Sequence, residues 1–188
     1  MPDHVCPFWV GYLLLSPLRK LLEHPDKLLG PFVRPGMTVL EPGCAMGFFT
    51  LPLARMVGSE GRVVAVEIQK KMIQKLEKRA GKAGLLDRIE IRQAGNDNLD
   101  VKDLSGQVDF SAAIHVVHEV PNQASFFSDI ITALKPGGRF FVVEPKGHVS
   151  RGNFEQTMAV AEKIGFQIDE PSGKKGAREA LLVKPHYL

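Results

Sequence analysis

The sequence has few cysteines and no apolar run long enough to cross a membrane. Its two cysteines, Cys6 and Cys44, are too few for a metal cage, and their spacing indicates no disulfide framework. The apolar stretch from Val5 to Leu15 is too short to span a bilayer, contains Pro7 and Gly11, and lacks the basic flank of a signal peptide. We therefore expect a reduced, cytoplasmic protein with no membrane segment.

A strong charge of either sign is also missing. The 188 residues carry a formal net charge of +3 with a pI near 8.9, which permits an anionic partner without arguing for one. The lysine-rich stretch 70–82 is expected to form an amphipathic helix with a solvated basic face, and a nucleic-acid patch is the weaker alternative. No internal repeat or low-complexity tract is present. With 44% hydrophobic residues, the chain can bury a core large enough to fold unaided.

The most informative segment runs from Met37 to Ala54 and reads MTVLEPGCAMGFFTLPLA. Residues 38–40 are apolar and partly β-branched, which predicts a strand buried on both faces. Small residues follow at alternate positions, Gly43, Ala45 and Gly47, where they let the backbone turn sharply and let a ligand approach it. A helix is predicted to begin near Phe48. A strand, a glycine turn and a helix start together indicate a nucleotide or nucleoside pocket.

Two acidic residues indicate which ligand this pocket takes. Glu41 ends the first strand in the string E-P-G-C-A-M-G, which differs from the dinucleotide fingerprint G-x-G-x-x-G. An anion at that position would repel a pyrophosphate and favour a cationic or amino-bearing ligand. Glu67 ends the next predicted strand, 62–67, where a carboxylate can accept hydrogen bonds from both ribose hydroxyls. The alternative for Glu67 is a surface glutamate at a strand end.

These features resemble the first motif of the class I S-adenosylmethionine-dependent methyltransferases, usually written as D or E followed by x-G-x-G-x-G. Ala45 replaces the middle glycine, a departure that the family commonly shows. The string LKPGGRFFVVEP, residues 134–145, closely matches a second recurrent motif of that family. The resemblance covers roughly residues 32–185 and implies S-adenosylmethionine as the cofactor. It implies an α/β fold, a Rossmann-like three-layer sandwich with a seven-stranded, mostly parallel sheet whose last strand is antiparallel.

The resemblance also implies which residues contact the cofactor. After the third strand the family often has Gly-Asp, whose acid receives the adenine amino group. Here Gly95 is followed by Asn96 and Asp97, so either of these can accept from that amino group, and turn chemistry alone is the alternative. The implied cofactor-binding set is Glu41, Gly43, Ala45, Gly47, Glu67, Ile68, Asn96, Asp97 and His115. No metal site is expected.

Catalysis with this cofactor depends mostly on holding the acceptor in line, because the sulfonium already makes the methyl group electrophilic. A base is added in many such enzymes when the acceptor is a hydroxyl or a protonated amine. The family uses the far end of the fourth strand, here predicted over 107–114, beside the methyl group. The titratable residues expected near that edge are His115, His118, Glu119, Glu144 and His148. His118 is the first choice as a base and His148 the second, and a purely structural role is the alternative for each.

Motifs that the sequence lacks restrict the class of methyl acceptor. The sequence has no N-P-P-Y or D-P-P-Y string, which argues against methylation of exocyclic amino groups, and it lacks the further cysteines expected of an arsenite methyltransferase. It also has no appended RNA-binding module. The remaining resemblance is to small-molecule methyltransferases such as those of ubiquinone and menaquinone synthesis. An RNA- or protein-directed methyltransferase, a non-catalytic cofactor-binding protein and a NAD-dependent oxidoreductase stay open as alternatives, the last disfavoured by Glu41 and the glycine spacing.

The N-terminal part of the chain lies outside the resemblance. We expect residues 1–31 to form a helical lid and residues 32–188 to form the methyltransferase core. In the lid, Phe8, Trp9 and Tyr12 would stack on a planar substrate. The alternative is a helix that only packs on the sheet edge. A homodimer also remains open.

Overall fold

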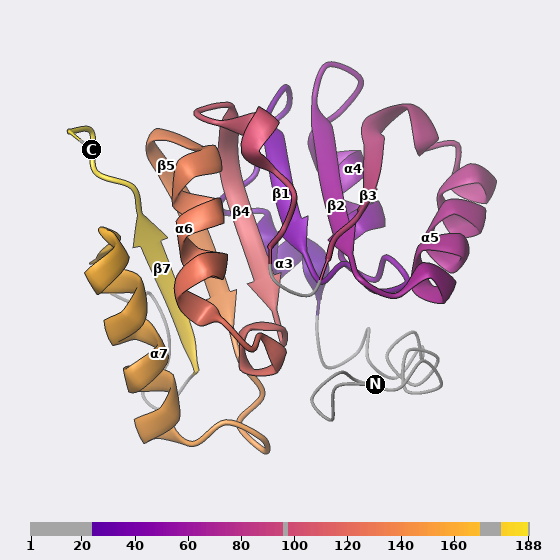
Figure 1. The fold of residues 1–188 in the computed structure, drawn as a ribbon. Helices are drawn as coiled ribbons and strands as arrows, with labels where there is room; N and C mark the ends of the chain where they lie inside the picture. Colours follow the sequence, from indigo (N-terminus) through magenta and orange to yellow (C-terminus); the bar gives the residue numbers. More distant parts are fainter. Residues whose placement is uncertain (1–23, 96–97, 170–177, 188) are drawn as a thin grey trace. The chain divides into compact units, whose positions relative to one another are not determined.

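The computed structural model describes residues 24–95, 98–169 and 178–187, drawn as coloured ribbon in Figure 1. These residues fall into two compact units, the first ending at Ala94 and the second starting at Gly95. Residues 1–23 of the predicted lid, with Phe8, Trp9 and Tyr12, lie outside the described residues, as do Asn96 and Asp97. Among the helices that are described, none is both long and apolar enough to cross a membrane.

The first unit is built on three parallel strands in the order β3-β2-β1. Its strands are β1 (Thr38–Pro42), β2 (Arg62–Glu67) and β3 (Ile89–Gln93). Its helices are α3 (Pro25–Leu29), α4 (Thr50–Met56), α5 (Lys70–Ala83) and the short 3-10 turn η1 (Leu86–Arg88). The valine-rich β2 is buried along almost its whole length, with α4 and α5 both packed against it. This matches the expectation that apolar, β-branched runs form strands buried on both faces.

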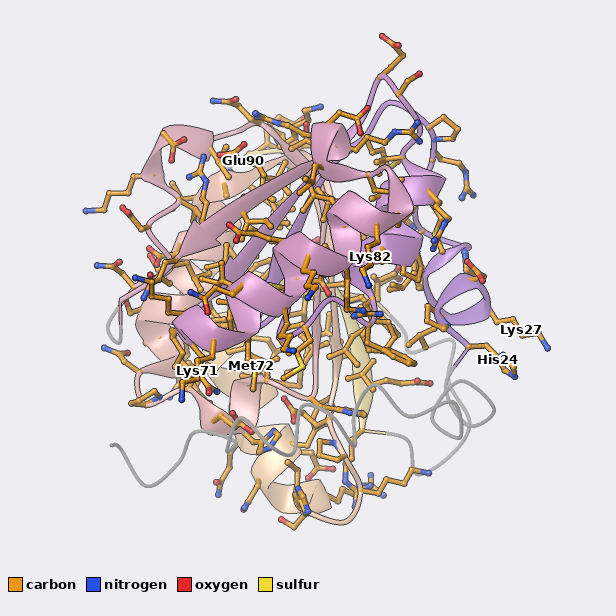
Figure 2. The ribbon with its side chains drawn as sticks, turned by 90° about the vertical axis from the view of Figure 1, so that its right-hand side faces the viewer. His24, Lys27, Lys71, Met72, Lys82 and Glu90 are labelled. Atoms are coloured by element: carbon orange, nitrogen blue, oxygen red, sulfur yellow. The ribbon has the colours of Figure 1, made fainter. Side chains whose placement is uncertain are left out.

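Helix α5 confirms the predicted amphipathic pattern. Its inward residues, spaced three and four apart, are buried: Met72, Ile73, Leu76 and Ala80. Figure 2 shows Met72 on this helix together with two of its lysines, Lys71 and Lys82, both of which are exposed. The helix ends at Gly84, whose left-handed backbone (φ 65°) lets its N–H reach back to the last turn.

The second unit has four strands in the order β4-β5-β7-β6. They are β4 (Val108–Ile114), β5 (Leu134–Val143), β6 (Gln167–Asp169) and β7 (Glu179–Val183). Strands β4 and β5 are parallel, whereas β7 runs antiparallel to β5. Its helical segments are η2 (Lys102–Leu104), η3 (Val117–Glu119), α6 (Gln123–Ala133) and α7 (Arg151–Ile164).

Helices α6 and α7 lie side by side over the strands of this unit (Figure 1). Each has a side-chain cap at its N-terminus: Asn122 accepts from the Ser125 N–H (3.0 Å) and Ser150 from the Asn153 N–H (3.1 Å). The core beneath them is a cluster of buried phenylalanine rings with centroids about 6 Å apart: Phe126, Phe127, Phe140 and Phe166.

The predicted fold class is confirmed: an α/β protein with seven strands, mostly parallel, and an antiparallel last strand. One boundary differs from the prediction. Helix α4 begins at Thr50 instead of Phe48, because Phe48 and Phe49 are both buried, with their rings edge to face, before the helix starts. Strand β5 includes the Pro-Gly-Gly segment, residues 136–138, at an irregularity in its pairing with β4.

Candidate functional site

The turn after β1 has left-handed backbone at three alternate positions. Gly43, Ala45 and Gly47 have φ values of 70°, 47° and 81°. The Gly43 and Cys44 N–H groups both donate to the Val66 carbonyl (2.8 and 3.1 Å), which ties the turn to β2. A left-handed conformation costs a non-glycine residue roughly 1–2 kcal/mol, so Ala45 is held there by its surroundings. The alternation of small residues thus reflects a backbone requirement.

Gly47 has a second reason to be glycine. A Cβ atom added there would lie 2.4 Å from Cδ1 of Leu76 on α5 and 2.9 Å from Cδ1 of Leu51 on α4. The missing side chain therefore lets two helices of this unit pack closely beside the turn. The small residue at position 47 was predicted to let a ligand approach, and close packing of the two helices is an additional cause that the sequence did not indicate.

Glu67, at the end of β2, holds the turn through hydrogen bonds to its side chain. Its Oε2 accepts from the Ala45 N–H, and its Oε1 accepts from the Ile68 and Gln69 N–H groups, each at 2.9 Å. The residue is buried, with 7% exposure, so these charge-assisted hydrogen bonds replace water around the carboxylate. The Ile68 N–H is one of these donors. Ribose binding by Glu67 and Ile68 stays a prediction.

Glu41, near the end of β1, is the most unusual group of this unit. Its carboxyl is buried (5% exposed), and Oε2 has no hydrogen-bond partner among the described residues. Burial raises the pKa of Glu41 from 4.5 to about 8; the Thr50 hydroxyl opposes this rise and the charge of Glu67 adds to it. The raised pKa favours the neutral form of Glu41 at pH 7 in the chain alone, whereas its position in the sequence led us to expect an anion.

Two other residues of the first unit surround this turn. The Arg79 guanidinium of α5 donates to the Met46 carbonyl, and burial lowers the pKa of Arg79. No feature of the sequence distinguished Arg79 from the other basic residues of its helix. Burial, and then the charges of Glu41 and Glu67, raise the pKa of the Cys44 thiol. Cys44 is therefore an unreactive residue that packs in the core.

The second unit carries the remaining predicted residues. His115 follows β4 directly with a left-handed backbone (φ 61°), and its N–H donates to the Val143 carbonyl at 2.7 Å. Strain of this kind persists only where the surrounding structure holds it. Asn96 and Asp97, the predicted adenine contacts, lie outside the described residues.

His118 lies in η3, and its ring contacts the carboxyl group of Glu144, which follows β5 directly. The ring Nδ1 of His118 contacts Glu144 Oε2, while Glu144 Oε1 accepts from the backbone N–H groups of Val117 (2.7 Å) and His118 (3.3 Å). The hydrogen bond to Glu144 raises the pKa of His118, and burial opposes this rise. The ring of His148 lies near that of His118, with centroids 6.2 Å apart. The structure thus gathers three predicted titratable residues, although their pairing was not predicted.

Comparison with known proteins gives one family. A model described as a methyltransferase domain matches residues 34–179. A ubiquinone/menaquinone biosynthesis C-methyltransferase from Marinomonas sp. (strain MWYL1) is 26% identical over 148 residues, which are 79% of this chain and 57% of that protein. The same enzyme from Brucella canis is 30% identical over 116 residues, 62% of this chain and 42% of that protein. The chain spans about half the length of the curated relatives it matches.

Solved structures agree on the fold. A SAM-dependent methyltransferase from Aquifex aeolicus has a TM-score of 0.82 at 22% identity, covering 95% of this chain and 98% of that one. A SAM-dependent O-methyltransferase from Thermotoga maritima has a TM-score of 0.64 at 22% identity, covering 86% of this chain and 64% of that one. At this identity the likeness shows the fold alone, and it confirms the predicted Rossmann-like architecture.

Proposed function

Because the chain belongs to the family of methyltransferase domains, as its sequence motifs predicted, we propose that it transfers a methyl group from S-adenosylmethionine to a small-molecule acceptor. The observation that carries this proposal is the buried carboxyl of Glu41 beside the strained turn 43–47. A buried oxygen without a partner costs roughly 1–3 kcal/mol, and a ligand that donates to it removes that cost.

The residues of the turn fit S-adenosylmethionine. The amino group of the ligand would donate to Glu41 Oε2, and its positive charge would favour the ionised form of Glu41, so binding would release a proton. A dinucleotide pyrophosphate fits poorly at the same position, because it only accepts hydrogen bonds and would leave the buried Glu41 Oε2 without a donor. This argues against the NAD-dependent alternative.

Other residues would complete the pocket. The backbone of Gly43, Ala45 and Gly47 would follow the amino-acid part of the ligand, and Glu67 with Ile68 would contact the ribose. The predicted contacts of Asn96 or Asp97 with adenine and of His115 with the cofactor belong to the same proposal. When bound, the cofactor supplies a methyl group on a positively charged sulfur. The protein supplies position, and it excludes water around the reacting atoms.

A small-molecule acceptor is supported by the names of the curated relatives, which are C-methyltransferases of ubiquinone/menaquinone biosynthesis. The absence of the N-P-P-Y and D-P-P-Y strings points the same way. We propose that the enzyme acts in the cytoplasm. Measurement of its mass in solution would distinguish a monomer from a homodimer. The competing function is methylation of RNA or protein.

Two measurements test the proposal. Calorimetry should show that the wild type binds S-adenosylmethionine and not NAD, and that Glu41→Gln weakens this binding about 10- to 100-fold, as expected for a lost hydrogen bond to a charged group. Glu77→Gln, an exposed glutamate on α5, is the matched control and should bind like the wild type. Labelled methyl groups should then enter a metabolite pool. Incorporation into an RNA pool alone would contradict the small-molecule acceptor, and failure to bind the cofactor would contradict the whole proposal.

We also propose that residues 1–31 form a lid on the substrate, because this segment carries aromatic residues. Deletion of residues 1–20 should leave S-adenosylmethionine binding intact and abolish methyl transfer to small acceptors. Unfolding of the truncated chain would identify the segment as a packing helix. Unchanged transfer would show that the segment has no part in the reaction.

A further inference from the structure

We propose that Arg79 is a positioning residue for cofactor binding, which holds the turn 43–47 in the shape that receives the amino-acid part of S-adenosylmethionine. This inference rests on the proposed function, which it deepens by naming a residue outside the turn on which cofactor affinity depends. Arg79 lies on α5, and its guanidinium donates to the carbonyl of Met46, 33 residues earlier. Both residues belong to the first compact unit.

Ala45 is the residue of this turn that most needs support from its surroundings. Its backbone is left-handed (φ 47°), which is unfavourable for a residue with a Cβ atom, whereas Gly43 and Gly47 adopt that conformation readily. Without support, Ala45 would shift toward the ordinary backbone regions and the turn would change shape. The contacts around Ala45 must therefore supply the free energy that keeps it left-handed.

Two charged side chains hold the backbone on either side of Ala45. The Ala45 N–H donates to Glu67 Oε2 (2.9 Å) at the end of β2. The carbonyl of the following residue, Met46, accepts from Arg79. Hydrogen bonds of this kind, to a carboxylate or from a guanidinium, are stronger than those between neutral groups. The strained residue is thus tied to β2 on one side and to α5 on the other.

The partner of the Arg79 guanidinium is unusual. Charged side chains that lose water on folding are usually paired with an opposite charge. Arg79 is half-buried, and burial lowers its pKa, yet among the residues that the structure describes it donates to the Met46 carbonyl and pairs with no carboxylate. Met46 is buried as well (1% exposed), so water has little access to take the place of the guanidinium. Loss of Arg79 would therefore leave a buried backbone oxygen without its donor.

Helix α5 supports this contact by packing directly against the turn. Leu76, one helical turn before Arg79, is fully buried, and a Cβ atom added to Gly47 would lie 2.4 Å from its Cδ1. Residues at that spacing lie on the same face of a helix, so α5 contacts the turn through both side chains. Leu76 sets how closely the helix approaches, and Arg79 orients the Met46 peptide. The backbone oriented in this way belongs to the part of the turn proposed to follow the ligand.

Amide hydrogen exchange of the full chain without cofactor tests the contact directly. Arg79→Met keeps an unbranched side chain and removes the guanidinium, so the turn should open locally more often. The Ala45 and Gly47 N–H groups should then exchange about 10- to 100-fold faster, as expected for a lost hydrogen bond to a charged group. Lys78→Met removes the same charge from an exposed neighbour on α5 and should leave both rates unchanged. Equal rates in Arg79→Met and the wild type would overturn the proposal.

Nuclear magnetic resonance of the wild type covers the case in which Arg79→Met does not fold. A hydrogen bond to the Met46 carbonyl slows rotation of the guanidinium, so the Nη protons of Arg79 should give separate signals. An Arg79 guanidinium that rotates freely in the wild type would overturn the proposal without any substitution.

Calorimetry with S-adenosylmethionine tests the effect on the cofactor. Arg79→Met should weaken binding about 10- to 100-fold, because only a fraction of the molecules then has the turn in the shape that binds. Arg79→Lys, which keeps the charge and a donor, should weaken binding less, and Lys78→Met should bind like the wild type. Ala45→Gly, added to Arg79→Met, should recover part of the affinity, since glycine adopts the left-handed conformation without support.

The recovery by Ala45→Gly distinguishes positioning from a general loss of stability, which a change at the turn would not repair. Unchanged affinity in Arg79→Met, or a loss that Ala45→Gly does not reduce, would overturn the positioning role. A wild type that binds no cofactor would overturn the proposed function instead. The exchange rates, measured without cofactor, would still show whether Arg79 holds the turn.

Discussion

Replacing Glu41 by glutamine should stabilise the protein, and the gain should grow with pH. Glu41 is buried, and its pKa in the folded chain is about 8 against 4.5 for an ordinary glutamate. Glutamine has nearly the shape of the protonated acid and cannot ionise. The substitution therefore removes a proton equilibrium without opening a cavity.

The magnitude follows from the two pKa values. Below pH 4.5 the carboxyl is protonated in both the folded and the unfolded chain, so wild type and variant differ little. As the pH rises, the unfolded wild type ionises and gains about 1.4 kcal/mol per pH unit, while the folded chain stays protonated until the pH reaches about 8. The wild type therefore loses stability as the pH rises from 4.5 to about 8. The variant should therefore exceed the wild type by about 3 kcal/mol at pH 7 and about 5 kcal/mol above pH 8.

Urea unfolding at several pH values measures this difference directly, with the chain freed of cofactor, since a bound ligand would add its own stabilisation. Glu77→Gln, on the exposed face of α5, should give a difference that hardly changes with pH. A constant difference between Glu41→Gln and wild type from pH 4.5 to 8 would refute the reasoning, because it would mean that Glu41 ionises normally in the folded chain.

Three further substitutions test the turn after β1 by chemical unfolding. Gly47→Ala should lower the free energy of unfolding by about 2–5 kcal/mol, because of the left-handed backbone and the clash with two leucines. Gly36 has a similar φ (83°) and open space around it, so Gly36→Ala should lower the free energy of unfolding by only about 1–2 kcal/mol. Equal losses for the two variants would exclude the clash. Ala45→Gly should be neutral or stabilise by up to about 1 kcal/mol, because relief of backbone strain is partly offset by the entropy of glycine, and clear destabilisation would contradict the assigned strain. Glu67→Gln should destabilise the chain without ligand by about 1–3 kcal/mol, because the NH₂ group of glutamine would face backbone N–H donors. Unchanged stability would mean that these hydrogen bonds do not stabilise the fold.

The sequence by itself determined the elements and the fold class. The β-branched run 62–67 became β2 at the predicted residues, and the spacing of Met72, Ile73 and Leu76 placed one face of α5 in the core. Gly165 ends α7 with a left-handed backbone, a conformation that glycine adopts readily. These features follow from local preferences and from the period of apolar residues, which neighbouring positions alone encode. The motif residues also marked where the family would hold its cofactor.

Only the tertiary structure decided which groups meet. Glu67 braces Ala45, 22 residues earlier, and Arg79 caps the Met46 carbonyl from 33 residues away. The pairing of His118 with Glu144 spans 26 residues. The same holds for the raised pKa of Glu41, because that pKa depends on how much water the folded chain removes from the carboxyl group. Hydrogen-bond partners and burial are properties of the packed chain, so residue type and spacing named the candidates while packing fixed their protonation and their neighbours.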